Sequence, residues 1–327
     1  MLWESVFGAV DPVSLAARLK KPKGPVDVIL DTDAYNEIDD QYALAYLVRS
    51  EPDCRVRAVT AAPFYSDPDS GRVCRSASPE DGMERSYQEI LKVLKLMDRE
   101  DLIPHVFRGS ERYLPGPLMP VESEAAQKII EISKEYGPER QLYVVAIGAI
   151  TNVASALLLD PTLRERIVVV WLGGHAHHYG PWTDFNMDQD ADAARVVFGC
   201  GVPLVQLPCL GVVSEFRFSR VELEYLFRGK NALCDYLIDN TFSYAEKKFG
   251  YDFWTKPLWD VTAVAWLLPG AFMEDRLMPS PVPHKGQTCS PNPDGHPMRY
   301  VYYIHKDQLA RDMADKLGSP GYTRETR

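Results

Sequence analysis

Short runs of apolar residues alternate along the chain with longer segments in which apolar residues recur every three or four positions. The short runs have the length and composition of buried strands, and the longer segments have the period of amphipathic helices. The predicted strands are Val26–Leu30, Val56–Ala62, Leu142–Ile147, Ile167–Leu172 and Pro203–Leu207. The predicted helices are Asp39–Val48, Glu84–Met97, Ser123–Tyr136, Asn152–Leu159, Ala191–Phe198 and Asp260–Leu268. This alternation predicts a parallel sheet covered by helices.

Two polar segments interrupt the alternation. Ser66–Asp81 is rich in Gly, Pro and Ser, and Met278–Pro297 contains six prolines in twenty residues. Long loops of α/β domains often form the rim or lid of an active site, although a solvated surface excursion fits both segments equally well.

Composition and charge exclude several classes of protein. The chain has 327 residues, 46% of them hydrophobic and 25% charged, which excludes a largely disordered or fibrous protein. The net charge is −10 and the sequence has no basic stripe, which argues against nucleic-acid binding. The longest apolar runs, such as Val168–Leu172, are far shorter than the roughly 18 residues of a membrane span. Neither nucleic acid nor membrane is therefore an expected partner.

The first residues and the cysteines bear on the compartment. The segment Met1–Pro12 carries Glu4 and Asp11 and lacks the basic start and apolar stretch of a secretory signal. The six cysteines are scattered and form no CxxC pair, so neither a zinc knuckle nor a disulfide framework is indicated. We therefore expect a cytoplasmic protein with reduced thiols.

The most informative segment follows the first predicted strand. Four aspartates, Asp31, Asp33, Asp39 and Asp40, lie within ten positions, and a helix begins at the last two. Ligands of open α/β sheets bind beyond the carboxyl ends of the strands, so a site is expected here. So many carboxylates repel one another unless a cation neutralises them, and oxygen ligands favour a hard ion, Ca²⁺ or Mg²⁺. The alternative is that Asp39 is an N-cap and the others are solvated turn residues.

Other motifs fit this segment less well. An EF-hand loop fails at Asn36 and Tyr42, where glycine and glutamate are required. The glycine patterns of Rossmann and P-loop folds are absent. The sequence Asp31-Thr-Asp33 resembles the haloacid-dehalogenase-like phosphatases, in which the first aspartate is the nucleophile, and this remains a rival interpretation.

Four blocks of sequence resemble, in order, those of the nucleoside hydrolases. The family's Asp-x-Asp-Pro-Gly-x-Asp-Asp-Ala, Gly-Pro-Leu-Thr-Asn, Glu-Phe-Asn with Asp-Pro-Glu-Ala-Ala, and Pro-Leu-His-Asp-Pro-x-Ala correspond to Asp31–Ala43, Gly148–Asn152, Asp184–Ala194 and Pro257–Ala263. A longer spacer, Ala34–Ile38, replaces the Pro-Gly-x of the first block. The resemblance implies a single α/β domain over residues 1–327 with a Rossmann-like core and a mixed, mostly parallel sheet flanked by helices.

The resemblance also implies a metal site. By matching position, Ca²⁺ would be held by Asp33, Asp40, the backbone carbonyl of Ile147 and Asp260, with water and ribose hydroxyls completing the usual six to eight ligands. Asp33 would be the general base that deprotonates the attacking water, and Asp39 would bind the ribose hydroxyls.

Further positions would bind the sugar. Asp184 and Asn186 follow a predicted strand and a Gly-rich turn, and they suit the far hydroxyl of the ribose. A ring of carboxylates would stabilise the positive charge that develops on the sugar as an N-glycosidic bond breaks. The alternatives are a loop acid for Asp184, a turn former for Asn186 and a first-turn helix acid for Asp260.

One departure from the family indicates which nucleobase is preferred. Trp259 stands where inosine-uridine preferring members have a histidine that is thought to protonate the leaving base, whereas purine-preferring members resemble this chain in having tryptophan. A purine preference follows, because an indole stacks on a purine over a larger area, although Trp259 also fits a core position. Phe64, Tyr65 and Trp182 are candidates for a second stacking ring.

The histidine group His175-Ala-His177-His178 has several interpretations. A ribose-binding asparagine of the family, six residues before Asp184, falls on His178, which we therefore predict to contact substrate. A proton donor at His177 or His178, or a plain loop, also fits. A zinc site is disfavoured because few other histidines remain to complete it.

These patterns predict a Ca²⁺-dependent hydrolase that cleaves ribonucleosides, with purines preferred, to base and ribose. The resemblance implies a small-molecule nucleoside as partner and a homo-oligomer, a dimer or tetramer. Two rivals remain. One is a catalytically weak ribosyl- or sugar-binding homologue that keeps the metal, and the other is a Mg²⁺-dependent phosphatase with Asp31 as nucleophile.

Overall fold

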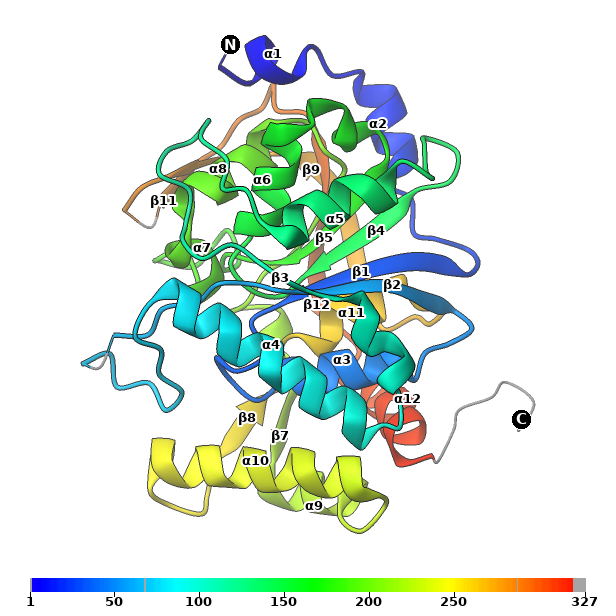
Figure 1. The fold of residues 1–327 in the computed structure, drawn as a ribbon, viewed down its shortest axis with the longest axis vertical. Coiled ribbons are helices and arrows are strands. Elements are labelled where there is room, and N and C mark those ends of the chain that lie inside the picture. Colours follow the sequence, from blue (N-terminus) through cyan, green and yellow to red (C-terminus); the bar gives the residue numbers. More distant parts are fainter. Residues whose placement is uncertain (1, 68, 287, 320–327) are drawn as a thin grey trace.

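The computed structural model, which describes residues 2–67, 69–286 and 288–319, is built on one eight-stranded sheet (Figure 1). The strand order across the sheet is β3 (Val106–Arg108), β2 (Cys54–Ala61), β1 (Val26–Thr32), β4 (Leu142–Ala146), β5 (Ile167–Leu172), β6 (Leu204–Leu207), β12 (Pro297–Ile304) and β9 (Met273–Pro279). All neighbours pair in parallel except β12 and β9, which are antiparallel. The predicted mixed, mostly parallel sheet is confirmed.

Helices cover both faces of the sheet, and each face has its own hydrophobic core (Figure 1). One core joins Val28 and Leu30 of β1 to buried residues of a set of six helices, and the opposite core joins Ile29 to a set of three. The first set comprises α3 (Asp40–Val48), α4 (Pro79–Leu96), α9 (Arg220–Phe227), α10 (Ala232–Phe249), α11 (Val261–Leu267) and α12 (Lys306–Gly318). The second comprises α5 (Glu124–Ser133), α6 (Thr151–Leu159) and α8 (Ala191–Gly199). Side chains alternate across a strand, which explains why neighbouring residues of β1 enter different cores.

The remaining elements are short. They are the helices α1 (Leu2–Phe7), α2 (Pro12–Arg18) and α7 (Phe185–Gln189), the 3₁₀ turns η1 (Glu100–His105), η2 (Pro161–Glu165) and η3 (Val213–Glu215), and two antiparallel strand pairs. One pair is β7 (Arg217–Ser219) with β8 (Thr255–Pro257), and the other is β10 (Val282–His284) with β11 (Thr288–Ser290). The first pair matters for function because the chain passes from β8 directly into α11.

The five predicted strands and six predicted helices are all present. The largest boundary error is at α4, which begins at Pro79, five residues before the predicted start. The Ser78 side chain accepts the N–H of Asp81 and Pro79 occupies the first helical position, so local capping begins the helix ahead of its apolar periodicity.

Nine of the nineteen described residues in the proline-rich segment Met278–Pro297 lie in strands, so the segment is not a simple loop. It contains the end of β9, the β10–β11 pair and the first residue of β12. The segment packs against α8, where Lys285 pairs with Asp192 at 2.9 Å and the Ser280 hydroxyl donates to the Phe198 carbonyl at 2.7 Å. None of its described residues lines the pocket presented below, so the lid interpretation does not hold for this segment.

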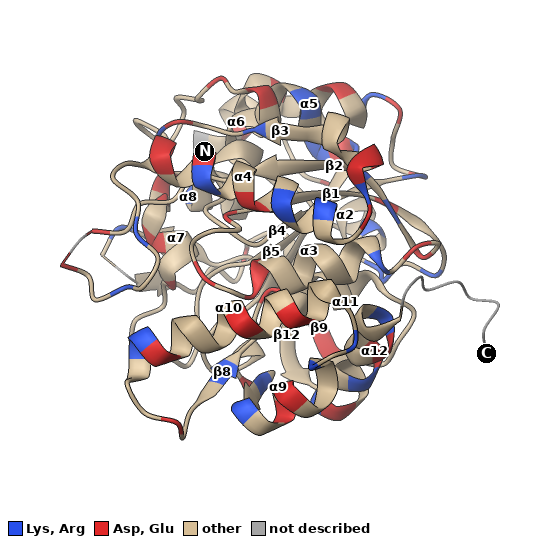
Figure 2. Cartoon of the chain, turned by 60° about the horizontal axis from the view of Figure 1, so that its bottom comes forward, with Lys and Arg blue, Asp and Glu red and all other residues tan. Residues whose placement is uncertain are grey.

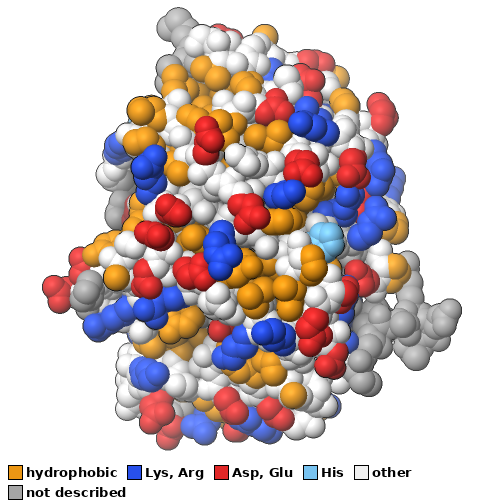
Figure 3. Space-filling model, viewed as in Figure 1, with side chains coloured by type: hydrophobic (Ala, Val, Ile, Leu, Met, Phe, Trp, Pro, Cys, Tyr) orange, Lys and Arg blue, Asp and Glu red, His pale blue; other side chains and the backbone are white. Residues whose placement is uncertain are grey.

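Charged side chains of both signs are interspersed over the outer surface. Both acidic and basic residues lie along α9, α10 and α12 (Figure 2), and no basic stripe crosses the face of the molecule seen in Figure 3. Among the described residues, no helix combines the length and apolarity needed to cross a bilayer.

We expect Asp27→Asn to destabilise the protein at neutral pH by about 1 kcal/mol. Asp27 lies buried at the start of β1 and accepts hydrogen bonds from Arg55 and from Arg140, the latter at 2.7 Å. Burial alone would raise the pKa of Asp27, but the two arginines lower it from 3.8 to about 2. The stabilisation is therefore present above pH 4 and is lost as the pH falls toward 2. Thermal unfolding at pH 7 and pH 2.5 measures the difference.

The control is Glu135→Gln, which removes an exposed ion pair with Arg57 and is expected to change stability little. An equal effect of Asp27→Asn at both pH values would contradict the ionic origin of the stabilisation.

Candidate active site

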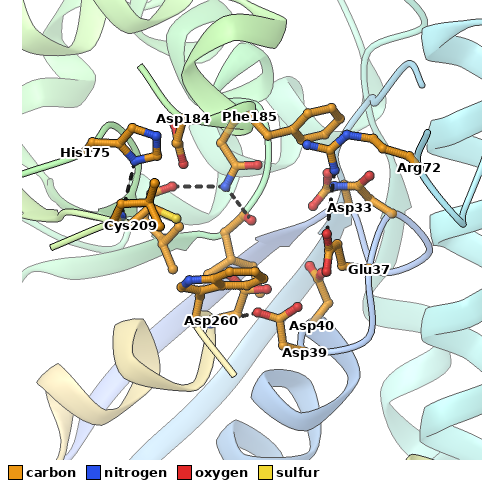
Figure 4. A pocket seen from close by; sticks show the side chains of 16 residues that line it. Asp33, Glu37, Asp39, Asp40, Arg72, His175, Asp184, Phe185, Cys209 and Asp260 are labelled. Atoms are coloured by element: carbon orange, nitrogen blue, oxygen red, sulfur yellow. Dashed lines mark hydrogen bonds and ion pairs between the residues drawn. The ribbon is translucent and has the colours of Figure 1, made fainter. Parts of the chain in front are cut away.

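A pocket of about 280 Å³ lies beyond the carboxyl ends of β1, β4 and β5 (Figure 4). The three strands run in parallel, so the segments that follow them meet at one edge of the sheet. Among the described residues, one guanidinium, that of Arg72, and six carboxylates line the pocket: Asp33, Glu37, Asp39, Asp40, Asp184 and Asp260. The pocket is therefore strongly acidic.

Three of these carboxylates form a compact group. Asp39, Asp40 and Asp260 each offer an oxygen, and these atoms lie within 4.8 Å of one another. The Asp260 backbone N–H donates to Asp39 Oδ2 at 3.3 Å, and the Thr32 hydroxyl donates to Asp40 Oδ1 at 2.5 Å. Asp39 occupies the N-cap position of α3 but its side chain makes no capping hydrogen bond. The simple N-cap interpretation of Asp39 is therefore wrong.

Without a cation these carboxylates resist ionisation. Burial, followed by the charge of Asp39, raises the pKa of Asp40 from 3.8 to about 7. Burial and the charges of Asp39, Asp40 and Asp33 raise the pKa of Asp260 well above its ordinary value. A bound cation would reverse both effects, because its charge favours the ionised carboxylates.

Asp33 lies in the same pocket, directly after β1. Its Oδ2 is buried and has no hydrogen-bond partner among the described residues. Burial and then the charge of Asp40 raise the pKa of Asp33 well above its ordinary value. The backbone of Gly148 presses against this carboxylate, since a Cβ at residue 148 would lie 3.0 Å from Asp33 Cγ and 3.1 Å from the Cβ of Ala62.

The donor set fits a hard divalent cation. Buried carboxylate oxygens converge, one on Asp33 and one on Asp39 lack hydrogen-bond donors, and Ile147 also lines the pocket. The grouping differs from the predicted ligand set at one position, because the compact trio contains Asp39 in place of Asp33. Ligation by Asp33 and by the Ile147 carbonyl stays a prediction.

Asp184 approaches from the opposite wall of the pocket (Figure 4), and Asn186 lines the same pocket. Asp184 caps α7, and its Oδ1 accepts the backbone N–H groups of Gly174 at 2.8 Å and Met187 at 3.0 Å. Both bonds end on Oδ1, which leaves Oδ2 for a ligand. Asn186 donates through Nδ2 to the Ile147 carbonyl at 2.9 Å and to the Leu172 carbonyl at 3.1 Å. Its side-chain oxygen is the atom left for a ligand, and its amide ties the ends of β4 and β5 together.

Two aromatic rings line the pocket. Trp259 is one, as predicted, and Phe185 is the second. Phe64 and Trp182 are almost wholly buried in the protein, and neither they nor Tyr65 line the pocket, so the three predicted partners for stacking were wrong. Phe185 lies inside the Asp184-Phe-Asn186 block, and this position was the available sequence signal.

Arg72 was missed by the sequence analysis although its segment, Ser66–Asp81, was a candidate rim. The Arg72 guanidinium lies 3.5 Å from the centre of the Phe185 ring and 3.6 Å from Glu37 Oε1 (Figure 4). The rim interpretation therefore holds for this segment.

The histidine nearest the site is His175 rather than His178. His175 lines the pocket, and its Nδ1 accepts the Leu210 N–H at 3.2 Å. Burial lowers the pKa of His175, so the neutral ring carries its proton on Nε2 and is a donor there. His178 lines a separate hollow together with His177, because the chain turns away from the pocket after His175. The predicted substrate contact of His178 is therefore wrong in this structure.

Asp31 cannot serve as an accessible nucleophile. It lies inside β1, wholly buried, with its side chain on the opposite face of the strand from Thr32. Its Oδ1 accepts hydrogen bonds from Thr60 at 2.6 Å and from Asn152 at 2.8 Å. Asp31 does not line the pocket, which removes the basis of the phosphatase interpretation.

A buried lysine behind the pocket was also missed. Lys256 of β8 is 2% exposed, and its Nζ lies 2.5 Å from Glu37 Oε2 and 3.9 Å from Asp39 Oδ1. Burial alone would lower the pKa of Lys256, but Glu37 and Asp39 raise it, so the side chain is an ammonium. Its sequence signal was weak, because a single lysine in a short strand is ordinarily a surface residue.

The site agrees with a comparison of the sequence with protein families. The family model described as inosine-uridine preferring nucleoside hydrolase matches residues 28–311. The chain belongs to this family. The predicted resemblance to the nucleoside hydrolases is thus confirmed, and the four sequence blocks all lie inside the matched region.

Curated nucleoside hydrolases align with most of the chain. The pyrimidine-specific ribonucleoside hydrolase RihA of Salmonella paratyphi B is 27% identical over 266 residues, which are 74% of this chain and 79% of that protein. RihA of Klebsiella pneumoniae is 28% identical over 267 residues, with the same two coverages.

Solved nucleoside hydrolases share the fold. A plant nucleoside hydrolase superposes with a TM-score of 0.71 at 19% identity, covering 90% of this chain and all of that one. The purine-preferring ribonucleoside hydrolase of Gardnerella vaginalis gives a TM-score of 0.69 at 19% identity, covering 90% of this chain and 98% of that one.

Proposed function

We propose that this chain is a Ca²⁺-dependent N-ribosyl hydrolase that cleaves ribonucleosides, purine nucleosides preferentially, to base and ribose. One observation carries the proposal. Asp39, Asp40 and Asp260 converge within 4.8 Å in the pocket that Asp33 and Trp259 also line. This arrangement supports a bound cation, a general base and a stacking ring around one pocket of about 280 Å³.

Each residue has a role in this proposal. Asp33, Asp40, Asp260 and the Ile147 carbonyl hold Ca²⁺, which when bound supplies positive charge to orient and acidify an attacking water. Asp33 removes the proton from that water, and Asp39 binds the ribose hydroxyls. The acidic walls stabilise the positive charge that develops on the sugar as the N-glycosidic bond breaks.

The purine preference rests on the aromatic rings. Trp259 and Phe185 line one pocket, and a purine covers more of an indole face than a pyrimidine does. The relatives point both ways, since RihA is named pyrimidine-specific and the Gardnerella vaginalis enzyme purine-preferring. Substrate preference is therefore a question for direct measurement.

The experiment is release of free ribose from a panel of purine and pyrimidine nucleosides, with and without a chelator. We expect turnover that is highest on a purine nucleoside, is lost with chelator and returns with Ca²⁺. Pyrimidine turnover above purine turnover would overturn the base preference alone. Calcium binding by calorimetry without turnover on any nucleoside would instead favour the ribosyl-binding rival.

Trp259→Leu is expected to raise the KM for purine nucleosides about tenfold while raising that for pyrimidine nucleosides less, because loss of stacking removes contact in proportion to ring area. Steady-state kinetics on inosine and uridine measure the two effects. The control is Trp254→Leu, which truncates a buried indole away from the pocket. Equal effects of Trp259→Leu on both substrates would contradict a stacking role.

Two properties follow from the family resemblance alone. We propose a cytoplasmic homo-oligomer, a dimer or tetramer, and light scattering of the purified chain tests the assembly. A monomer at micromolar concentration would contradict it.

A further inference from the structure

The buried ammonium of Lys256 lies directly against the ring expected to stack on the base. Its Nζ is 3.8 Å from the centroid of Trp259, within the range of a cation–π contact. Lys256 and Trp259 are close because only two residues separate them at the passage from β8 into α11. The contact is buried, so water screens it little.

Trp259 lines the pocket, whereas Lys256 does not and is 2% exposed. A base stacked on the ring face opposite Lys256 would have the indole between itself and the positive charge. The ammonium and the base would then lie about 7 Å apart, because each lies at about half that distance from the indole ring.

Two carboxylates face the Lys256 ammonium, those of Glu37 and Asp39, and Asp39 Oδ1 lies 3.9 Å from its Nζ. Glu37 is its closest anion at 2.5 Å, but Glu37 also accepts the Tyr244 hydroxyl at 3.0 Å and lies 3.6 Å from Arg72. The Glu37 charge is thus shared between two cations and one hydroxyl.

The reaction places negative charge on the departing base, and a nearby positive charge would stabilise it. When the N-glycosidic bond breaks, its electron pair stays on the base nitrogen, while water adds hydroxide to the anomeric carbon and its remaining proton ends on the base. Trp259 has no ionisable proton to give at this position. Negative charge therefore builds up on the base before protonation is complete.

We propose that Lys256 is a positioning residue that holds Trp259 on the ring face opposite the base and stabilises the departing base electrostatically through the indole ring. This inference rests on the proposed function. It predicts that Lys256 increases kcat more for a substrate with a poor leaving group than for one with a good leaving group.

The test compares two substrates in Lys256→Met. Inosine has a poor leaving group, whereas p-nitrophenyl riboside releases an anion that is stable without help. We expect kcat on inosine to fall about 10-fold to 100-fold and kcat on p-nitrophenyl riboside to fall less than about threefold. Lys256→Arg, which keeps the charge, is expected to recover part of the loss on inosine. Calcium affinity by calorimetry is expected to change less than tenfold in both variants.

Two controls accompany the comparison. Lys316→Met removes another buried lysine that pairs with an aspartate at 2.8 Å and lies 4.9 Å from a tyrosine ring, far from the pocket, and it should leave both activities unchanged. In a Trp259→Leu background, Lys256→Met should cost less on inosine than in the parent, because the ring that carries the effect is absent.

The outcomes separate this inference from the proposed function. If the parent enzyme cleaves neither substrate, the proposed function fails. If the parent cleaves both and Lys256→Met loses both equally, or if Lys256→Arg recovers nothing, Lys256 has only a structural role and the inference is overturned. If circular dichroism shows that Lys256→Met is unfolded, Lys256→Arg is compared in the parent and in the Trp259→Leu background instead. An equal change of kcat on inosine in both backgrounds would contradict action through the ring.

Discussion

Replacing Asp33 with asparagine is expected to lower kcat by about 10³-fold while retaining a large part of the calcium affinity. Asparagine keeps an oxygen at the position of the buried Asp33 Oδ2 but cannot accept the proton of an attacking water. Alanine at the same position removes both functions, so Asp33→Ala should lose affinity for Ca²⁺ as well as turnover. Ribose release and calorimetry on the two variants separate the proposed role of Asp33 as general base from its proposed role as a calcium ligand.

The matched control is Asp192→Asn, which neutralises a buried aspartate at the start of α8 that does not line the pocket. It should retain parental kcat and calcium affinity. Turnover by Asp33→Asn within tenfold of the parent would show that another group removes the proton, and Asp39 would be the next candidate in the pocket.

The second large effect concerns the stability of the calcium-free protein. The folded protein with Asp40 at a pKa of about 7 binds more protons than the unfolded chain, in which that carboxyl group has its ordinary value of 3.8. Stability without Ca²⁺ therefore decreases as the pH rises from 4 toward 7 and above. In the proposed site protons and Ca²⁺ compete for the same oxygens, so calcium should stabilise the protein more at pH 8 than at pH 6. At 100 times the dissociation constant, Ca²⁺ adds about 2.7 kcal/mol.

Thermal unfolding at pH 6 and pH 8, with chelator and with Ca²⁺, measures how pH and calcium change the stability. KCl at matched ionic strength is the control for general screening of charges by salt. Asp260→Asn removes one charge of the trio, so its chelated form should be more stable at pH 8 than the chelated parent and should respond little to Ca²⁺. A chelated parent that is as stable at pH 8 as at pH 6 would refute the repulsion among the three carboxylates.

The sheet, its flanking helices and the location of the site were predictable because they depend on local signals. The strand Val26–Leu30 is a continuous apolar run, and the aspartates after it mark the carboxyl edge where parallel strands place their ligands. The strands β9 and β12 were missed because prolines at their ends and exposed residues along β9 hide the alternation of a buried strand.

The contacts between distant segments were not predictable in the same way. Arg72, Phe185 and Lys256 reach the site from a loop, a five-residue helix and a three-residue strand, and none of these carries a periodic pattern. His178 was predicted from spacing alone, and the spacing fails because the loop after His175 turns away from the pocket. One local pattern also misled, since Asp31 belongs to the strand and its side chain follows the strand's alternation into the protein interior.

The close approach of Gly148 to Asp33 has a consequence for redesign of the enzyme. A Cβ at residue 148 would crowd the carboxylate, so lengthening residue 33 to glutamate or adding a methyl group at residue 148 would displace the proposed general base. A library intended to broaden the substrate range should therefore keep this pair fixed and vary Arg72 and Phe185 on the outer wall. Residues 33 and 148 would then keep the geometry of the proposed general base, and residues 72 and 185 would determine which substrates bind.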